Sequence, residues 1–379
     1  MKKRKMLLTA TVMKIHVSLF HYPCLKMFHD LGWETWVCSK NDYENPADCV
    51  VPYCDHYIDT PYERSPFKPA NIKAYRMVKA IIDRENFDLV YCHTPVGAVV
   101  ARLACISARK KGTKVVYMAH GFHFYKGAPL LNWLIYYPLE RFFSRFTDGL
   151  ITINREDYER SQKFHAGKTI LIPGVGIDLK KFQGKENLRE AVRQSLGIGK
   201  KQIVLLSVGE LSKRKNHMAV IEALAKLKEY DILYMICGEG SMRDQLLEKA
   251  EKLGVSNKVR LLGFRKDIPA LHKAADIFVF PSLQEGLPVA LMEAMASGLP
   301  IVASEIRGNE DLIQDSEGGY LVNARDSVQY AAAIRKMIQN PKKREEMEQR
   351  NLKIIEDYSQ TAILQKMKEF FNEIVGGLC

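Results

Sequence analysis

The stretch FVFPSLQEGLPVALMEAMASGLPIVAS, residues 278–304, decides the fold that this sequence predicts. An apolar run at 277–280 ends at Pro281 and is followed by a polar loop. A helix is expected from about Pro288, and a second apolar run begins at Pro300. Strand, loop, helix and strand in this order are typical of a crossover between parallel strands.

Two carboxylates lie in this stretch, Glu285 in the loop and Glu293 inside the expected helix. The backbone N–H groups at a helix start have no intrahelical partners and, with the helix dipole, form an anion site that both side chains can face. Gly286 lets a ligand approach the backbone, and Pro288 begins the helix without losing a donor. The alternative is an ordinary crossover between parallel strands, in which both glutamates are surface residues in contact with water. Two glutamates around Gly286 and Leu287 favour a ligand site.

The segment resembles the E-x7-E segment of retaining GT-B glycosyltransferases of family four, which transfer a sugar from a nucleotide-sugar donor to an acceptor. The resemblance implies that Glu285 contacts the donor sugar hydroxyls and that Glu293 hydrogen-bonds the nucleotide ribose. It also implies that backbone amides around Gly286 and Leu287 approach the donor sugar and phosphates.

The length of 379 residues suits two α/β domains. A Pro/Gly-rich break at 173–176 predicts the domain boundary near residue 182. We therefore expect a Rossmann-like acceptor-binding domain at 1–182 and a Rossmann-like nucleotide-sugar-binding domain at 183–358. The resemblance implies a GT-B fold with a cleft between two doubly wound α/β domains, and a final helix at 359–379 that crosses back to the first domain.

In the N-terminal half, apolar runs alternate with helix-like segments, as in a parallel sheet, at 6–12, 35–39, 89–91, 115–118 and 149–153. Lys14 closes the first run, which predicts a buried strand rather than a signal peptide. Ligands bind beyond the carboxyl ends of such strands, so polar residues there are candidates.

His120 directly follows one of these runs, and its context AHG resembles the family loop that faces the donor sugar. The resemblance implies a positioning or hydrogen-bonding role near the reacting centre. Four further residues are weaker candidates for the acceptor side: His16, His93, His123 and Asn154. Single histidines such as His93 and His123 are more often structural. No glycine pair follows the first strand, unlike many family members. The runs at 93–95, 119–142 and 151–159 resemble a subgroup that builds bacterial exopolysaccharides and capsules.

The C-terminal half begins with an apolar run at 202–208 that ends in Gly209 and a basic loop. Arg214 and Lys215 in this loop are suited to a diphosphate. The family usually has Arg directly after the glycine and Lys five positions later, so Lys215 matches while Glu210 departs from the pattern. The resemblance further places the nucleotide base near Phe264-Arg265.

The formal net charge of +12 is uneven, because residues 1–182 hold 27 Lys/Arg against 17 Asp/Glu, a balance of +10. Nucleic acid is the weakest of the possible anionic partners, since no zinc-ligand spacing, RNP-like motif or basic tail occurs. An anionic membrane surface or a phosphorylated acceptor fits better. The aromatic and basic run at 129–146 is typical either of a bilayer boundary or of a core helix interrupted at Pro138.

No apolar run reaches the roughly 18 residues of a membrane span. The eight cysteines form no C-x-x-C pair, which favours a reducing cytoplasm. We therefore expect a cytoplasmic protein, peripheral at the inner face of the cell membrane.

The function expected is a retaining glycosyltransferase in extracellular or capsular polysaccharide synthesis. Its predicted donor is a nucleotide-sugar, with UDP favoured by the resemblance, and its predicted acceptor is a polyprenyl-diphosphate-linked saccharide. No cofactor or metal is expected, since no D-x-D motif occurs. Two alternatives remain open: a nucleotide-sugar 2-epimerase of GT-B fold, and a non-catalytic nucleotide-sugar-binding scaffold, which Glu210 would favour.

Overall fold

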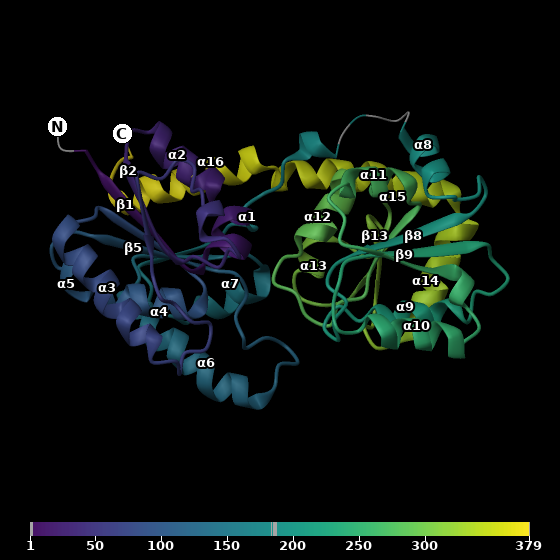
Figure 1. Ribbon diagram of the computed structural model, residues 1–379, viewed down its shortest axis with the longest axis horizontal. Helices are drawn as coiled ribbons and strands as arrows, with labels where there is room; N and C mark the ends of the chain where they lie inside the picture. Colours follow the sequence, from purple (N-terminus) through teal and green to yellow (C-terminus); the bar gives the residue numbers. More distant parts are fainter. Residues whose placement is uncertain (1–2, 183, 185–187, 379) are drawn as a thin grey trace. The chain divides into compact units, whose positions relative to one another are not determined.

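The computed structural model describes residues 3–182, 184 and 188–378. The chain divides into two compact units, Met1–Gly176 with Gln360–Cys379, and Ile177–Ser359. The first segment of the first unit thus ends at Gly176, slightly before the domain boundary expected near residue 182. Each unit is a parallel sheet with helices on both faces (Figure 1).

The sheet of the first unit has the order β3-β2-β1-β4-β5-β6-β7, and all its strand pairs are parallel. Its strands are β1 (Lys5–Val12), β2 (Glu34–Lys40), β3 (His56–Asp59), β4 (Leu89–His93), β5 (Lys114–Ala119), β6 (Gly149–Thr152) and β7 (Lys168–Leu171). Apolar residues run almost without interruption through the inner strands, because helices bury both faces of the sheet. The first run is a buried strand, as predicted.

Helices follow the strands of this unit. They are α1 (Ser18–Phe20), α2 (Tyr22–Asp30), α3 (Ala70–Glu85), α4 (Pro95–Ala104), α5 (Ile106–Arg109), α6 (Leu130–Phe143), α7 (Arg155–Ser161) and α16 (Gln360–Val375). Helices α3 and α4 cover one face, while α2 and α16 cover the other (Figure 1). A π-helical turn, η1 (Met13–Val17), connects β1 to α1.

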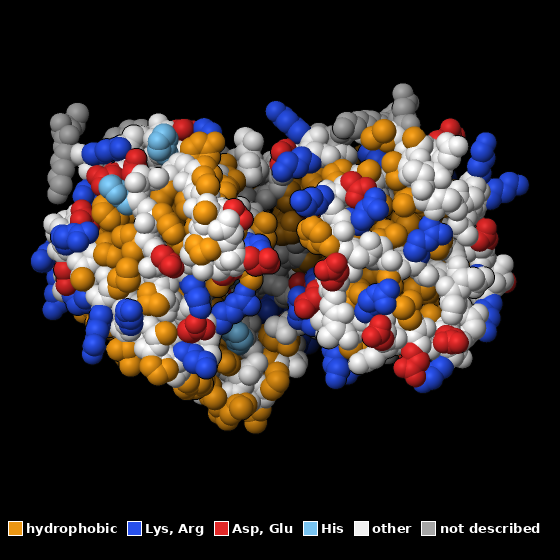
Figure 2. All heavy atoms as spheres, in the orientation of Figure 1, with side chains coloured by type: hydrophobic (Ala, Val, Ile, Leu, Met, Phe, Trp, Pro, Cys, Tyr) orange, Lys and Arg blue, Asp and Glu red, His pale blue; other side chains and the backbone are white. Residues whose placement is uncertain are grey.

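Helix α6 corrects one of the two interpretations of residues 129–146. It continues through Pro138 instead of being interrupted there. Phe143 is buried and Trp133, Tyr136 and Tyr137 pack against the core of the first unit, so one side of the helix faces the core. Six apolar side chains of the helix are exposed: Leu130, Leu131, Leu134, Ile135, Leu139 and Phe142. Figure 2 shows hydrophobic side chains gathered over this helix. Its inner side is held by Glu140, which pairs with the buried Arg102 of α4 at 3.0 Å.

The sheet of the second unit has the order β10-β9-β8-β11-β12-β13, again with parallel pairs. Its strands are β8 (Ile203–Val208), β9 (Ile232–Cys237), β10 (Val259–Gly263), β11 (Ile277–Phe280), β12 (Ile301–Ser304) and β13 (Gly319–Val322). The helices are α8 (Leu188–Ser195), α9 (His217–Leu224), α10 (Arg243–Lys252), α11 (Ile268–Ala274), α12 (Val289–Ala296), α13 (Asn309–Leu312), α14 (Ser327–Gln339) and α15 (Pro341–Ile355).

The strand order places a topological switch point in each sheet. In the first unit the order reverses between β1 and β4, and in the second between β8 and β11. Loops that leave adjacent strands in opposite directions open a crevice at this point, where doubly wound folds bind ligands. The quoted stretch, residues 278–304, covers β11, α12 and β12 and therefore borders the second switch point.

Candidate active site

A cluster of three charged side chains lies at the switch point of the second unit. Oε1 of Glu285, in the loop after β11, accepts hydrogen bonds from Nη1 of Arg214 and Nζ of Lys215, both at 2.8 Å. The two cations come from the loop after β8, so the two loops that border the switch point meet here. The ammonium of Lys215 also lies 4.7 Å from the ring centroid of Phe280. The structure thus brings together three residues that the sequence singled out separately.

Backbone contacts hold the two loops of this cluster in place. The amide of Leu283 donates to the carbonyl of Arg214 at 2.8 Å, and the side chain of Asn216 donates to the carbonyl of Pro281 at 3.0 Å. Asn216 has a left-handed backbone with φ 54°, a conformation that asparagine tolerates better than most residues. The cluster is therefore fixed by the fold and does not depend on a ligand to assemble.

Arg307 is a member of this region that the sequence did not single out. Its Nε donates to the backbone carbonyl of Glu285 at 3.1 Å, and its side chain is buried. It lies just after β12, so only the pairing of β11 with β12 brings it to the Glu285 loop. An arginine following a strand in a polar loop is the only signal that could have indicated it.

Gly308 explains how the backbone can fold closely around Gly286. Its φ of +82° is left-handed, and a Cβ there would lie 2.4 Å from the carbonyl oxygen of Gly286. A side chain at position 308 would therefore displace the Glu285–Leu287 loop. Leu287 is itself buried, which anchors the start of α12.

Glu293 lies in the second turn of α12, is half-buried, and has no ion-pair partner among the described residues. Burial raises the pKa of Glu293 to about 7, and Lys181 opposes part of this shift. Near neutral pH its carboxyl group is therefore divided between the protonated and ionised forms. A ribose hydroxyl can donate to either form of the carboxyl, and only the protonated form can also donate to the hydroxyl.

The remaining donor-side candidates differ in how they relate to the cluster. A Cβ at Gly209 would lie 3.1 Å from Cε of Lys215, so glycine there leaves room for the lysine. Glu210 is exposed. Phe264 is 68% exposed after β10, a strand separated from β8 by β9. Arg265 pairs with Asp267 at 2.5 Å and is not brought to Glu285 by any contact of the described residues.

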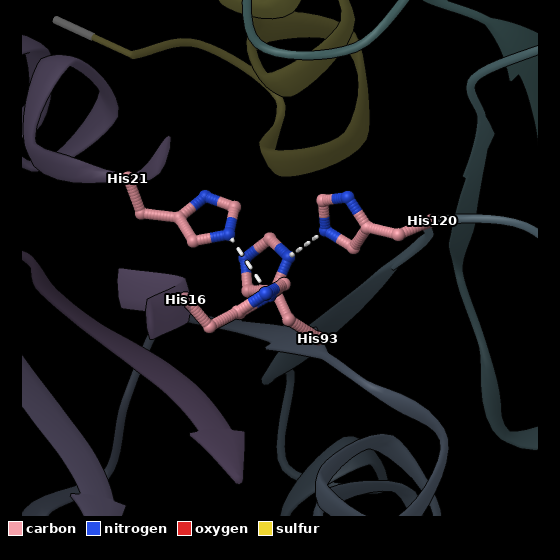
Figure 3. A group of neighbouring side chains, drawn as sticks. All are labelled: His16, His21, His93 and His120. Atoms are coloured by element: carbon pink, nitrogen blue, oxygen red, sulfur yellow. Dashed lines mark hydrogen bonds between the residues drawn. The ribbon is translucent and has the colours of Figure 1, made fainter. Parts of the chain in front are cut away.

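In the first unit the structure gathers histidines at the switch point (Figure 3). His120 follows β5, and its Nε2 lies 3.2 Å from Nδ1 of His93, the last residue of β4. His16, in η1, has its ring centroid 4.7 Å from that of His120. His21, which the sequence reasoning missed, completes the group, with its Nε2 3.2 Å from Nε2 of His16. The four imidazoles form the candidate cation site among the described residues.

The other two acceptor-side candidates lie outside this group. His123 stacks on Tyr136 of α6, with ring centroids 4.6 Å apart. Asn154 is buried and caps α7, because its Oδ1 accepts from the amide of Asp157 at 2.9 Å and its Nδ2 donates to the Asp157 carboxylate. The polar atoms of Asn154 are thus engaged within the fold.

Comparison with known families covers most of the chain. Residues 24–181 match the family described as Glycosyltransferase Family 4, and residues 189–353 match Glycosyl transferases group 1. The first match covers most of the N-terminal segment of the first unit and extends over 177–181 of the second, and the second match lies within the second unit. The switch-point cluster of Glu285, Arg214 and Lys215 lies within the second match.

Individual relatives agree with these families. Glycosyltransferase EpsD of Bacillus subtilis is 38% identical over 97% of this chain and 96% of its own length. The UDP-Gal:alpha-D-GlcNAc-diphosphoundecaprenol alpha-1,3-galactosyltransferase of Escherichia coli is 32% identical over 69% of this chain and 68% of its length. The crystal structure of Anabaena HepE with UDP, 21% identical, superposes with a TM-score of 0.80 over 98% of this chain and 100% of that chain. The chain therefore belongs to glycosyltransferase family 4 and is a glycosyltransferase of the GT-B type.

Proposed function

We propose that the protein is a retaining hexosyl- or N-acetylhexosaminyl-transferase that moves a sugar from a UDP-sugar to a polyprenyl-diphosphate-linked saccharide in extracellular or capsular polysaccharide synthesis. The observation that carries the proposal is the cluster of Arg214, Lys215 and Glu285 at the second switch point. Two cations beside a carboxylate suit a sugar diphosphate, since the cations match the phosphates and the carboxylate matches sugar hydroxyls.

The chemistry follows from the charge that builds up on the leaving diphosphate. Lys215 and Arg214 would stabilise this charge as the sugar–phosphate bond breaks, together with the free N–H groups at the start of α12. These groups would take the part that a metal ion plays in other transferases, so the donor site is proposed to need none. His120 would position or hydrogen-bond the reacting sugar.

The surroundings of Glu285 argue against a role as a covalent nucleophile. Its Oε1 is engaged by two cations at 2.8 Å, which withdraws electron density from the atom that would attack. We therefore propose front-face attack by the acceptor hydroxyl while the diphosphate leaves from the same side. Glu285 would instead hold the donor sugar hydroxyls.

The donor and acceptor classes are supported by the relatives. Anabaena HepE has been solved with UDP and with UDP-glucose, and the named acceptor of the Escherichia coli relative is a saccharide on diphosphoundecaprenol. Such an acceptor lies in a bilayer, and the exposed apolar face of α6 with Arg141 and Arg145 suits an anionic bilayer boundary. Within the described residues, no helix combines the length and apolarity needed to cross a membrane. The proposed location is the inner face of the cell membrane.

The release of nucleoside diphosphate tests the transfer reaction. A panel of UDP- and GDP-sugars is incubated with the protein, with and without a membrane lipid extract. We expect release from one donor that depends on the extract and falls by at least about 100-fold in Glu285→Ala. Glu345→Ala, at an exposed position on α15, is the matched control and should release at the wild-type rate.

Two results would contradict sugar transfer and would distinguish the epimerase from the scaffold. Conversion of the donor sugar without any acceptor would indicate an epimerase. Binding of nucleotide-sugar without release from any donor would indicate a scaffold, as the exposed Glu210 in place of the expected arginine allows.

Liposome binding tests the membrane part. We expect binding to vesicles with anionic lipid that weakens as salt rises, because the attraction is screened. Replacing both Leu131 and Leu134 by serine should weaken binding at least about tenfold, since each leucine would lose apolar burial. Val328→Ser, at an exposed position of the second unit, is the control. Equal binding to neutral vesicles at every salt concentration would rule out the electrostatic part.

A further inference from the structure

Four imidazole rings converge at the switch point of the first unit (Figure 3). One ring nitrogen from each of His16, His21, His93 and His120 can be chosen so that all four lie within 4.8 Å of one another. Two of the nitrogen pairs are already 3.2 Å apart, His16 with His21 and His93 with His120. Four nitrogens this close form a potential coordination set for a single ion.

The fold places these rings from separate elements. His93 ends β4 and His120 follows β5, while His16 lies in the π-helical turn after β1 and His21 directly precedes α2. Strands β1 and β4 are neighbours where the strand order reverses, the position at which doubly wound sheets bind ligands. Single π-helical turns are also frequent at functional sites. The group is therefore located where a site is expected on topology alone.

All four side chains of this group are imidazoles. Neutral imidazole keeps a lone pair on one ring nitrogen and is a common ligand of transition metals.

Hydrogen bonding within the protein does not account for the whole group. Nδ1 of His21 and Nε2 of His93 are buried and have no hydrogen-bond partner within the described part of the chain. The two rings lie close together, with centroids 3.8 Å apart and an angle of 34° between their planes. Buried polar atoms without a partner are uncommon in folded proteins. Each of these two nitrogens belongs to a ring whose other nitrogen makes a 3.2 Å contact, Nε2 in His21 and Nδ1 in His93.

We propose that His16, His21, His93 and His120 bind one divalent transition-metal ion, for which zinc is the best match. Tetrahedral zinc with Zn–N bonds of about 2.0–2.1 Å separates its ligand nitrogens by roughly 3.3–3.4 Å. Two pairs are near this separation at 3.2 Å, and the remaining pairs lie within 4.8 Å. The set holds no carboxylate, so magnesium and calcium, which prefer oxygen ligands, fit it poorly.

The ion would tie together the ends of strands β4 and β5, the turn η1 and the residue between α1 and α2. His16 and His120 are half-buried and His21 and His93 are buried, so the ion would be reached from the side of His16 and His120. It would fix the orientation of the His120 ring, and it would place positive charge at this end of the sheet. All four ligands belong to the first unit, so the proposal does not depend on the donor or acceptor assigned above.

Cobalt and zinc binding to untagged full-length protein test the site. After chelation and desalting, Co²⁺ should bind at one ion per chain and give the intense visible absorption of tetrahedral cobalt, and one equivalent of Zn²⁺ should displace it. His16→Gln should weaken Co²⁺ binding at least about 100-fold and abolish the thermal stabilisation by Zn²⁺. His29→Gln, at an exposed histidine of α2 in the same unit, is the matched control and should bind as the wild type does.

The Co²⁺ absorption spectrum of the wild-type protein tests the proposal even if His16→Gln fails to fold. Weak binding with the pale absorption of octahedral cobalt, or metal content that is equal in wild type and His16→Gln, would mean an adventitious ion only and would overturn the proposal. Loss of nucleotide release in Glu285→Ala bears on the transfer reaction alone and leaves this result unchanged.

Discussion

Glu285 and Glu293, eight positions apart in the quoted stretch, have opposite electrostatic surroundings. Glu285 shares one oxygen between Arg214 and Lys215. Glu293 is half-buried on α12, and burial raises its pKa to about 7. A carboxylate that pairs with cations is suited to a fixed role beside a diphosphate, while a carboxyl that titrates near neutrality can accept or donate a hydrogen bond.

The pKa of Glu293 predicts how stability depends on pH. The folded-state pKa of about 7 lies above the ordinary value of 4.5, so the native state binds more protons than the unfolded state between these values. Stability should therefore fall as pH rises from about 4.5 to 7, and the loss should persist above pH 7. Glu293→Gln should remove this part of the pH dependence and raise the Tm above pH 7 relative to wild type.

Thermal unfolding across pH 5–8 measures this effect. Glu345→Gln, at an exposed glutamate of α15, is the control and should follow the wild-type curve. Parallel curves for wild type and Glu293→Gln would contradict the raised pKa. UDP binding, measured in parallel, should weaken in Glu293→Gln if this side chain meets the ribose.

Among single residues, Arg307 and His21 belong to the candidate sites, but the sequence did not indicate them. Both are polar residues without a motif of their own. Arg307 gains a site position because β12 pairs with β11, and His21 because the turn after β1 folds toward β4 and β5. The contacts of Arg307 with the Glu285 loop and of His21 with His93 are not local in sequence, so no spacing along the chain could indicate them.

At the scale of elements, α6 combines an anchored side with an exposed one. Glu140 accepts two hydrogen bonds from the buried guanidinium of Arg102 and one from the hydroxyl of Tyr117. The guanidinium also lies 4.4 Å from the ring centroid of Tyr117. This ion pair and the inward-facing Phe143 and Trp133 hold α6 against the core, while its exposed leucines are left free for a bilayer surface.

The ion pair predicts a strong response to one substitution. Glu140→Ala leaves the guanidinium of Arg102 buried without its carboxylate, which should cost about 3–5 kcal/mol of stability. The double variant Arg102→Met/Glu140→Leu removes both charges and should recover most of the loss. Thermal unfolding of the three proteins measures this. A double variant no more stable than Glu140→Ala would show that packing, and not the unpaired charge, causes the loss.

The helices and strands also show which elements can be predicted from local sequence patterns. Strands buried on both faces were predicted because their apolar runs are nearly continuous, as in β1, β8 and β11. Strand β3 was missed because it lies at the sheet edge, and its sequence His56–Asp59 is only partly buried. An edge strand needs little apolar character and resembles a loop in sequence.

At the scale of the whole molecule, the end of the chain completes the core of the first unit. The chain leaves this unit after Gly176 and returns at Gln360 as α16. Phe371 of α16 lies edge-on to Tyr91 of β4, with ring centroids 5.0 Å apart. The indole N–H of Trp33 donates to the carbonyl of Leu378 at 2.9 Å. The first unit is therefore not complete without the last residues of the chain.

Phe371→Ala tests this closure. Removing a fully buried phenylalanine should cost about 3–5 kcal/mol, so the Tm of the first unit should fall by several degrees. Lys366→Ala, at an exposed position of the same helix, should leave the Tm unchanged. Calorimetry measures both. An unchanged Tm in Phe371→Ala would contradict the role of α16 in the core.

The sequence by itself determined the two α/β halves, nearly all the strands, and the loops that carry Glu285, Arg214 and Lys215. These features depend on burial patterns and turn residues that are local in the chain. Only the tertiary structure decided which loops meet, that α6 exposes apolar side chains, and that four histidines converge. Those outcomes depend on strand order and helix packing, which bring together residues too far apart in sequence for any local pattern to record.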